Sequence, residues 1–489
     1  MPPSKAILAP LSVAATLLAG CAVGPNYAPP SLSEPSRYLG QAAVDQRATS
    51  TPSDLTTWWA SFDDPELTRL VGLALAQNLD LAQAQARITQ SRAQLGAATA
   101  VLLPQGVGTA SATRSRLSVA TPEGELLQRL PGFGRDGELY ELDVGASWEI
   151  DLFGGLRRER EATQAEFEAA NAGAQAARIA VAADVADTYF AIRGLQARLA
   201  VAREQVETQR QLVALVQLQR GKGVASQLQL DQAQGALKQA ESTVPVLQAS
   251  LEQAFNGLDV LLGAQPGAYR GELLAPAPIP TAPAISLAGG PADLLRRRPD
   301  LIVAERRLAA SNARIGAAIS DYYPKISLTG LIGAASGGAG NLLTSAAGQD
   351  SGVAGLRWRL FDFGRVEAEV ANARGRNAEA LAAYRLAVLR ATEDVENAFS
   401  ELVQSEAQAR ALADAERSLT RARDTSAVAY KGGVVSLIEV LDADSRLLAT
   451  RDARAAAATA ADRAAVASFR ALGGGWNPAA PDLHVADSR

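Results

Sequence analysis

The sequence contains an internal duplication, which restricts the chain to folds built from two similar halves. Residues 80–104 align without gaps on residues 300–324, and further along the offset falls from about 220 to about 210 positions. The matched residues include types that do not recur by chance in an Ala-rich chain, such as Gly96 and Gly316, Trp148 and Trp358, and Gly154 and Gly364. Whatever one copy forms is therefore expected in the other copy as well.

Each copy contains a stretch in which apolar and polar residues alternate. Residues 140–152 place Tyr, Leu, Val, Trp and Ile against Glu, Asp, Gly and Ser, and residues 352–361 repeat the pattern more weakly. This period of two predicts strands long enough to cross a bilayer at a tilt. Two further strands are expected at about 105–115 and 325–333. Charged residues on one face and aromatic residues on the other fit a barrel with a wet interior, while a four-stranded soluble sandwich is the alternative.

The remainder of each copy predicts very long helices. No Pro interrupts the chain from Gly155 to about Gln219, or from Val366 to about Ala429. About 65 helical residues extend for ~100 Å, and the spacing of small and apolar residues is that of a coiled coil. Shorter helices are expected at 227–262 and 437–472, and one precedes the first strand at 80–102. Two short helices together approach the length of one long helix, so we expect them to stack end to end beside it.

The N-terminus has the features of a lipoprotein signal peptide. Lys5 precedes an apolar stretch from Ala6 to Leu18, which is too short to span a bilayer comfortably. The sequence Leu18-Ala19-Gly20-Cys21 then predicts cleavage before Cys21, which would carry a diacylglyceryl group and an N-acyl chain. Two or three acyl chains anchor a protein stably to a membrane. Ala22 lacks the negative charge that favours retention in the inner membrane. An ordinary signal peptide is the alternative to a bacterial outer-membrane lipoprotein.

Composition excludes several classes of function. The chain has one Cys and one His, His484, so it has no internal disulfide, and zinc, haem and iron–sulfur sites are close to excluded. Catalysis by a nucleophile and a His would need a residue of the C-terminal tail. The net charge of −5 is spread among both signs, so no nucleic-acid partner is expected. We therefore expect no enzyme activity and no cofactor beyond the lipid on Cys21.

Closure of the strands requires self-association. After Cys21 no apolar run approaches the ~18 residues of a spanning helix, so a mature chain that crosses a membrane does so as strands. Four strands cannot close a barrel around water, because even the smallest barrels need about eight. A homotrimer would supply twelve strands, and its repeats would continue as twelve helical segments.

Several motifs resemble the outer-membrane efflux protein family, which includes TolC-like channels and the lipid-anchored OprM-type branch. They are Cys21 to Pro29, Trp58-Trp59, Arg297-Arg298-Pro299-Asp300-Leu301 and Asn312-Ala313-Arg314-Ile315-Gly316. The resemblance covers almost the whole mature chain. It implies a mainly α fold with a trimeric, twelve-stranded transmembrane β-barrel, continued by a twelve-helix periplasmic α-barrel. It also implies an exit duct for small molecules, which docks through a periplasmic adaptor protein to an inner-membrane efflux transporter.

The turns between long and short helices are the first candidate site. They are Gly223-Val224-Ala225-Ser226 and Gly433-Val434-Val435-Ser436. Glycine permits a positive φ in each turn, and Ser226 and Ser436 suit the N-caps of the returning helices. We expect these turns at the periplasmic tip, where they would present small and apolar groups to the adaptor. A purely structural hairpin is the alternative.

A periplasmic gate is the second candidate site. Glu439 and Asp442 are three residues apart, so they share a helix face and would form six carboxylates in a trimer. The resemblance assigns gating roles to Tyr430 and Asp442, with Glu439 at a second acidic position. Val435 stands where TolC-like channels carry a gating arginine, so that salt bridge is absent. An ordinary solvated acidic face is the alternative.

The predicted organisation has six parts: the signal peptide (1–20), an N-terminal arm (21–62), repeat 1 (63–262), a Pro-rich linker (263–290), repeat 2 (291–472) and a C-terminal tail (473–489). Two other functions remain open. One is a lipid-anchored coiled-coil envelope scaffold without a pore, and the other is a periplasmic hydrolase that uses Glu and Asp pairs. The sequence does not identify an exported compound.

Overall fold

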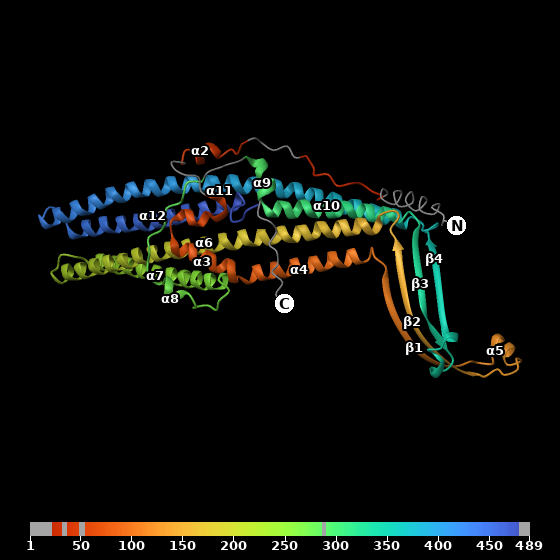
Figure 1. Cartoon of the computed structure of the whole chain (residues 1–489). Coiled ribbons are helices and arrows are strands. Elements are labelled where there is room, and N and C mark those ends of the chain that lie inside the picture. Colours follow the sequence, from red (N-terminus) through yellow and green to blue (C-terminus); the bar gives the residue numbers. More distant parts are fainter. Residues whose placement is uncertain (1–21, 32–36, 48–53, 286–289, 479–489) are drawn as a thin grey trace. The chain divides into compact units, whose positions relative to one another are not determined.

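The computed structural model describes residues 22–31, 37–47, 54–285 and 290–478 (Figure 1). The predicted signal peptide, the predicted lipid-attachment residue Cys21 and His484 lie outside these ranges. The described residues form two compact units. The first contains the residues up to Pro30 together with 89–168 and 305–383, and the second contains those from Ser31 to Ile88, 169–304 and 384 onward.

The two repeats have the same order of elements, which confirms the duplicated strand and long-helix fold. The first repeat comprises α4 (Leu79–Ala100), β1 (Gln105–Arg116), β2 (Asp136–Ile150), α6 (Gly155–Gly221) and α7 (Gln227–Leu261). The second comprises α10 (Pro299–Ser320), β3 (Lys325–Ser336), β4 (Gly348–Arg357), α11 (Arg365–Lys431) and α12 (Leu437–Ala471). Both long helices have 67 residues and both returning helices have 35. Figure 1 shows α7 returning along α6, and α12 along α11.

Shorter elements lie before, within and between the two repeats. They are α2 (Gln41–Asp45), the 3₁₀ helix η1 (Leu55–Phe62), α3 (Pro65–Gln77), α5 (Pro122–Leu127), α8 (Arg270–Leu273), α9 (Pro291–Arg297), η2 (Ala339–Asn341) and η3 (Ser345–Ala347). α5 lies in the connection between β1 and β2. A helical turn forms there because the Thr121 hydroxyl accepts a hydrogen bond from the Gly124 N–H at 3.2 Å, and Pro122 fixes the first helical φ. None of the helices in the described ranges is both long enough and apolar enough to cross a membrane.

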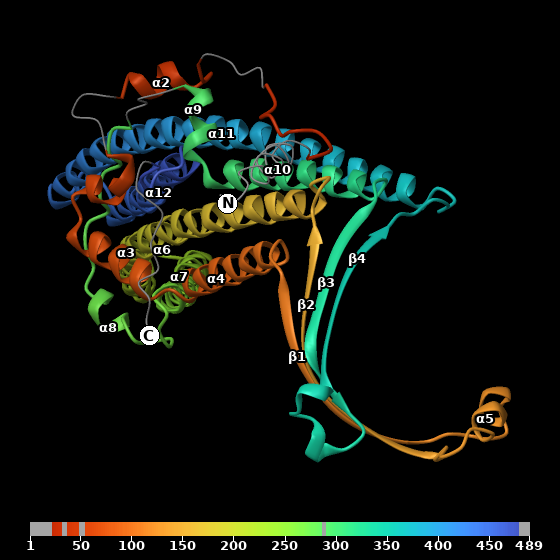
Figure 2. The ribbon, with the colours of Figure 1, turned by 45° about the vertical axis from the view of Figure 1, so that its right-hand side comes forward.

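The four strands form one antiparallel sheet in the order β1-β2-β3-β4 (Figure 2). Val144 pairs with Ile332, and Asp143 with Gly333, so even-numbered and odd-numbered residues of both strands occupy opposite faces. One face carries apolar residues, among them Tyr140, Leu142, Val144, Trp148, Ile326, Leu328, Ile332 and Leu356. The other carries polar ones, among them Thr109, Ser111, Glu141, Asp143, Glu149, Lys325, Ser327 and Gln349. The two-faced sheet expected from the alternation is present.

Two strands end earlier than the alternation indicates. β2 ends at Ile150 instead of Leu152, and β4 ends at Arg357 instead of Phe361. Pro324 lies just before the start of β3. If β2 continued, Leu152 would stand opposite Pro324, and if β4 continued, Trp358 would stand opposite it. Proline has no N–H to donate to a neighbouring strand, so the ladder stops there. β2 and β4 begin four residues earlier than predicted, at Asp136 and Gly348.

The core of the second unit contains an aromatic cluster. Trp58 of η1 is fully buried and stacks on Phe469 of α12, with ring centroids 5.2 Å apart and planes 11° apart. Phe62 packs against Phe190 of α6 at 4.8 Å. The Trp-Trp motif of the N-terminal arm therefore fixes η1 against α6 and α12.

Returning and short helices meet end to end at equivalent joints in the two repeats. Asn78 caps α4 by accepting from the N–H groups of Asp80 and Leu81, and its amide donates to the Leu261 carbonyl at the end of α7 at 2.8 Å. At the matching position, Arg298 donates to the Ala471 carbonyl at the end of α12 at 3.4 Å. Arg298 also forms ion pairs with Asp300 and with Asp394 of α11. The Arg-Arg-Pro-Asp-Leu motif is thus a structural joint.

Candidate functional site

The two helix-hairpin turns have the same backbone geometry. Gly223 and Gly433 both have φ = +74°, which L-residues with a side chain rarely adopt. The Val224 N–H donates to the Gln219 carbonyl and the Val434 N–H to the Ala429 carbonyl, each at 2.9 Å. These bonds close the long helices with Schellman motifs. The predicted glycine roles in the turns are therefore structural requirements of the hairpins.

Serine residues start the returning helices, as predicted. The Ser226 hydroxyl accepts from the Gln229 N–H at 3.2 Å, and the Gln229 side chain accepts from the Ser226 N–H at 2.8 Å, which completes a capping box. The Ser436 hydroxyl accepts from the Glu439 N–H at 3.4 Å. It also donates to the Glu439 carboxylate at 3.4 Å. Glu439 thus has a local contact with the helix N-cap that sequence reasoning did not include.

Both turns expose apolar side chains at equivalent positions. Val224 and Val434 are the most exposed, and flanking them are the matched pairs Leu218 with Val428 and Leu228 with Ile438. Ala225 and Val435 are half-buried. Isolated exposed apolar residues are common, but a set repeated in both hairpins next to rigid turns is suited to a protein partner. Next to the first turn, α6 and α7 pack against each other through a buried core of Val213, Val216, Leu230 and Ala233.

The three predicted gate residues are exposed and lie around the second turn. Tyr430 is on the last turn of α11, whereas Glu439 and Asp442 are on the first two turns of α12. The Asp442 carboxylate pairs with Arg446 one turn further along α12, at 3.0 Å. Arg446 reduces the negative charge that we predicted for this face. Because both partners are well exposed, the pair contributes little to stability.

A polar cluster below the turns joins the two hairpins, and the sequence did not reveal it. The Thr208 hydroxyl of α6 donates to Asp444 of α12 at 2.8 Å, and Arg423 of α11 lies 3.7 Å from the same carboxylate. Gln205 of α6 donates to the Ser445 hydroxyl at 2.9 Å. One feature of the sequence could have indicated this cluster: Gln205 and Thr208 are three residues apart and therefore share one face of α6.

Ion pairs continue the connection between α6 and α12 along the second unit. Arg198 makes a two-pronged contact with Asp452, at 2.9 and 3.3 Å, and Arg463 makes another with Asp187, at 2.6 and 2.9 Å. A pocket of about 180 Å³ lies beside the first of these pairs and is lined by residues of α6, α7 and α12, including Gln205 and Leu448. These paired charges position the two hairpins side by side.

Side chains on the polar face of the sheet form hydrogen bonds from strand to strand. The Asp143 carboxylate of β2 passes over Gly333 of β3 and accepts from the Gln349 amide of β4 at 2.8 Å. A Cβ atom on Gly333 would lie 1.9 Å from an Asp143 oxygen, so glycine is required there. On the other side, Ser111 of β1 donates to Glu141 at 3.0 Å. Polar side chains thus link β1, β2 and β4 on this face, and the contact between β2 and β4 crosses β3.

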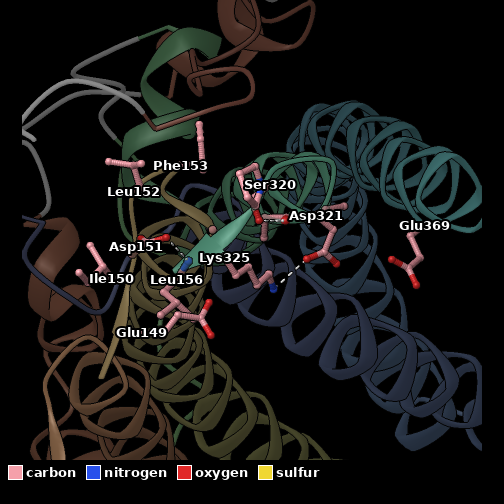
Figure 3. Close-up of a pocket in the computed structure, with 14 residues that line it drawn as sticks. Glu149, Ile150, Asp151, Leu152, Phe153, Leu156, Ser320, Asp321, Lys325 and Glu369 are labelled. Carbon is pink, nitrogen blue, oxygen red and sulfur yellow. Dashed lines mark hydrogen bonds and ion pairs between the residues drawn. The ribbon is translucent and has the colours of Figure 1, made fainter. Parts of the chain in front are cut away.

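A pocket of about 340 Å³ lies in the first unit at the foot of the sheet (Figure 3). Lys325 at the start of β3 extends toward Asp321, and their ion pair measures 2.8 Å. The Asp151 carboxylate caps α6 by accepting from the Leu156 and Arg157 N–H groups, at 3.2 and 2.8 Å. Two carboxylates of the pocket are therefore already engaged, that of Asp151 in capping α6 and that of Asp321 in an ion pair. Among the described residues, no three His, Cys, Asp or Glu side chains converge as a metal site would require.

The segment that follows Cys21 is held by hydrogen bonds to residues at the end of β2 and at the start of α6. The Val23 N–H donates to the Phe153 carbonyl at 3.0 Å. Arg158, almost fully buried, donates to the carbonyls of Val23 and Gly24 and to the Asn26 side chain. A Cβ atom on Gly24 would lie 2.4 Å from Gly316 Cα, so this segment and α10 touch through two glycines. Residues 22–27, hereafter the N-terminal strap, therefore hold the chain next to the end of β2.

A two-faced sheet joined to duplicated long-helix hairpins defines a channel-type outer-membrane fold. A family model described as outer membrane efflux protein matches residues 70–264 and 290–474. The cation efflux system protein CusC of Escherichia coli O6:H1 is 31% identical over 487 residues, which cover 97% of this chain and 100% of CusC. The probable outer membrane lipoprotein SilC of Salmonella typhimurium is 30% identical over 471 residues, covering 94% of this chain and 97% of SilC. The solved structure of the outer-membrane channel OprN superimposes with a TM-score of 0.82 at 34% identity, over 93% of this chain and all of OprN.

The chain belongs to the outer membrane efflux protein family. It has the fold of the TolC-like channels, and its location is the bacterial outer membrane. Members of this family are efflux channels rather than enzymes. The resemblance found in the sequence motifs is thereby confirmed.

Proposed function

We propose that the chain is the exit duct of a tripartite efflux pump, and that it works as a homotrimer that carries small molecules across the outer membrane. The observation that carries this proposal is the pairing of the sheet. Within the described ranges, β1 and β4 each pair on one side only. An unpaired strand edge is not tolerated in lipid, so the sheet must close through further copies of itself. Three copies would supply twelve strands.

The same stoichiometry suits the helices. Each chain has two long helices, and in each repeat the returning helix and the short helix meet end to end at Asn78 or Arg298. Each chain thus contributes four helical columns, and three chains would contribute twelve. The polar face with Glu141 and Asp143 would line the bore, and the apolar face would contact lipid.

The proposed protein partners are inferred from the two helix-hairpin turns, which would form the periplasmic tip. The exposed apolar residues of both turns, including Val224 and Val434, would contact a periplasmic adaptor protein, and the adaptor would connect the duct to an inner-membrane efflux transporter. CusC is a component of a cation efflux system by its name. Tyr430, Glu439 and Asp442 would form the periplasmic gate, with Arg446 beside them.

Loss of function in cells tests the proposal. Deletion of the gene should increase susceptibility to at least one group among dyes, antibiotics, metals and organic solvents, and the wild-type gene should restore resistance. The purified protein should have the mass of three chains by light scattering, corrected for detergent. Unchanged susceptibility to every group together with a monomeric mass would instead favour a lipid-anchored scaffold without a pore.

The Asp442→Asn variant should reduce the preference of the isolated channel for cations. Removal of one carboxylate per chain from a narrow entrance, with Arg446 left in place, is expected to lower the permeability ratio of K⁺ to Cl⁻ about two- to fivefold. Reversal potentials in planar bilayers measure this ratio. Asp414→Asn is the control, because Asp414 is an exposed partner of Arg417 on α11, away from the turns. Equal ratios in both variants and the wild type would remove Asp442 from the gate.

Acylation at Cys21 is proposed from the signal peptide and is supported by the strap. Residues 22–27 lie at the foot of the sheet, so acyl chains on the preceding residue, Cys21, would be close to the membrane surface. The Cys21→Ser variant should lack the mass of the diacylglyceryl and N-acyl groups in intact-protein mass spectrometry. An unmodified Cys21 in wild-type protein from membranes would contradict the proposal.

A further inference from the structure

The pocket of about 340 Å³ at the foot of the sheet has walls that are fixed by contacts within the first unit. Phe153 stacks on Tyr323, with ring centroids 4.6 Å apart and planes 19° apart. Gly155, at the start of α6, lies so close to α10 that a Cβ atom on it would be 2.2 Å from the Ser320 hydroxyl oxygen. Asp151 holds the same helix start through two backbone N–H groups. The cavity is therefore a defined feature of the fold.

Four carboxylates line this pocket, and three of them have a cationic partner. The three ion pairs are Asp151 with Arg157 at 3.3 Å, Asp321 with Lys325 at 2.8 Å, and Glu369 with Arg365 at 3.0 Å. The fourth carboxylate belongs to Glu149 of β2, which is half-buried and makes no hydrogen bond or ion pair with any described residue. The pocket thus contains one negative charge that the described chain leaves uncompensated.

The strand neighbours of Glu149 do not supply a positive charge. Glu149 stands opposite Ser327 of β3, and the pairing of β2 with β1 has already ended at Ser147. Lys325 lies two residues before Ser327 on the same polar face, but its ammonium group is bound to Asp321, and Figure 3 shows the side chain extending in that direction. The Glu149 carboxylate is therefore available to a cation that enters the pocket.

Aliphatic side chains form much of the remaining wall. They are Ile150, Leu152, Leu156, Ala317, Ala318 and Pro324. A cavity of this size with an apolar lining and a few charged groups has the usual form of a small-molecule site. A metal ion does not suit it, because no three ligating side chains converge among the described residues. An organic cation suits both features, since its charge can face Glu149 while its apolar body covers the aliphatic wall.

The second repeat shows that a carboxylate is not a structural requirement at this position. The offset of about 210 positions places Arg359 where the first repeat has Glu149. Arg359 lies 3.8 Å from Asp321 and 3.6 Å from Glu369, so it contributes to the ion pairs of this region. Val101 takes the place of Asp321 at the foot of the first hairpin. The two repeats therefore differ in charge here, and we expect one such site per chain.

We propose that the pocket binds organic monocations that have an apolar body, and that Glu149 is the residue that holds their positive charge. This inference rests on the proposed function, because the polar face that carries Glu149 would line the bore, and it names one class of compound that the duct carries. Bound cations would occupy the level at which the sheet meets the helices. Neutral and anionic compounds of similar size would lack the contact with Glu149.

Binding of ethidium, a fluorescent aromatic monocation, tests the proposal. The purified protein is placed in nanodiscs of phosphatidylcholine, with empty nanodiscs as the blank, and fluorescence anisotropy is measured. Binding should saturate at one ethidium per chain. Tetraphenylphosphonium, a second organic cation, should compete, whereas the neutral compound 1-naphthalenemethanol should not. Saturable binding that the neutral compound displaces as well as the cation does would contradict the role of charge.

The Glu149→Gln variant should bind ethidium at least about tenfold more weakly, because the amide keeps the shape of the side chain and removes its charge. Glu367→Gln is the matched control, since Glu367 is an exposed carboxylate of α11 that lies outside the pocket. It should change the affinity less than about twofold. Ala318→Leu adds apolar volume to the wall and leaves every charge in place, and it should weaken binding several-fold by filling the cavity.

Light scattering of the wild type and of each variant separates this inference from the proposed function. Trimers that show no saturable binding, or that bind ethidium equally well with and without the Glu149 carboxylate, would overturn the cation site and leave the duct intact. A monomeric wild-type protein would contradict the proposed function itself.

Discussion

Replacement of Trp58 with alanine is expected to destabilise the helical part of the protein by about 3–5 kcal/mol, the usual cost of removing a large aromatic side chain from a core. Trp58 is fully buried and stacks on Phe469, with Trp59 and Phe62 at its edges. The cavity would lie where η1, α6 and α12 meet, so neighbouring groups have little freedom to fill it. Thermal unfolding followed by circular dichroism in detergent measures the effect.

Trp58→Phe is the matched variant. The Trp58 indole N–H is buried and has no hydrogen-bond partner among the described residues, so phenylalanine keeps the stacking and removes an unsatisfied donor. We expect this variant to lose no more than about 1.5 kcal/mol. Equal loss of stability in the alanine and phenylalanine variants would show that stacking on Phe469 is not what holds η1 in place.

The Asp462→Asn variant is expected to be more stable than the wild type at neutral and alkaline pH. Asp462 of α12 is 1% exposed, and one of its carboxylate oxygens has no hydrogen-bond partner among the described residues. Burial, together with the negative charge of Glu406, raises the pKa of Asp462 to about 8. Glu406 itself is paired with Arg47. A buried carboxyl of this kind is neutral in the folded protein over much of the physiological range.

The sign of the pH dependence follows from proton binding. Between the unfolded pKa of about 3.9 and the folded pKa of about 8, the folded state holds a proton that the unfolded state has released. Stability from this group is therefore complete in acid and is lost as the pH rises toward 8. Asparagine removes this dependence, so the advantage of Asp462→Asn should grow from near zero at pH 4 to about 2–4 kcal/mol at pH 7.

Melting curves at a series of pH values measure the difference between Asp462→Asn and the wild type. Asp452→Asn is the control on the same helix, because Asp452 is partly exposed and paired with Arg198. That substitution should lower stability by less than about 1 kcal/mol, and neutral pH should not increase the stability of this variant. If the effect of Asp462→Asn were the same at every pH, Asp462 would not be a proton-holding group.

The helices were predictable because their ends are decided by local chemistry. Gly223 and Gly433 end the long helices, and Ser226 and Ser436 begin the returning ones, so the predicted bounds agree with the structure to within about two residues. A glycine that needs a positive φ and a serine that caps a helix act within a few residues of themselves. Periodicity could therefore fix these elements without tertiary information.

Strand ends and the polar cluster could not be predicted in the same way. The alternation continues through Trp358, yet β4 ends at Arg357 because its partner strand begins after Pro324. Asp442 was recognised from its position, whereas Asp444, which joins the hairpins through Thr208, was not, because its partner is 236 residues away in the sequence. Contacts of this kind depend on which helices are neighbours.

Cryo-electron microscopy of the protein, purified from membranes and placed in lipid nanodiscs, tests directly whether three chains form one channel. We expect particles with three copies of the chain, one closed ring of twelve strands in the bilayer and a water-filled bore enclosed by the helices. Particles that contain a single copy, or an assembly whose strands enclose no bore, would contradict it.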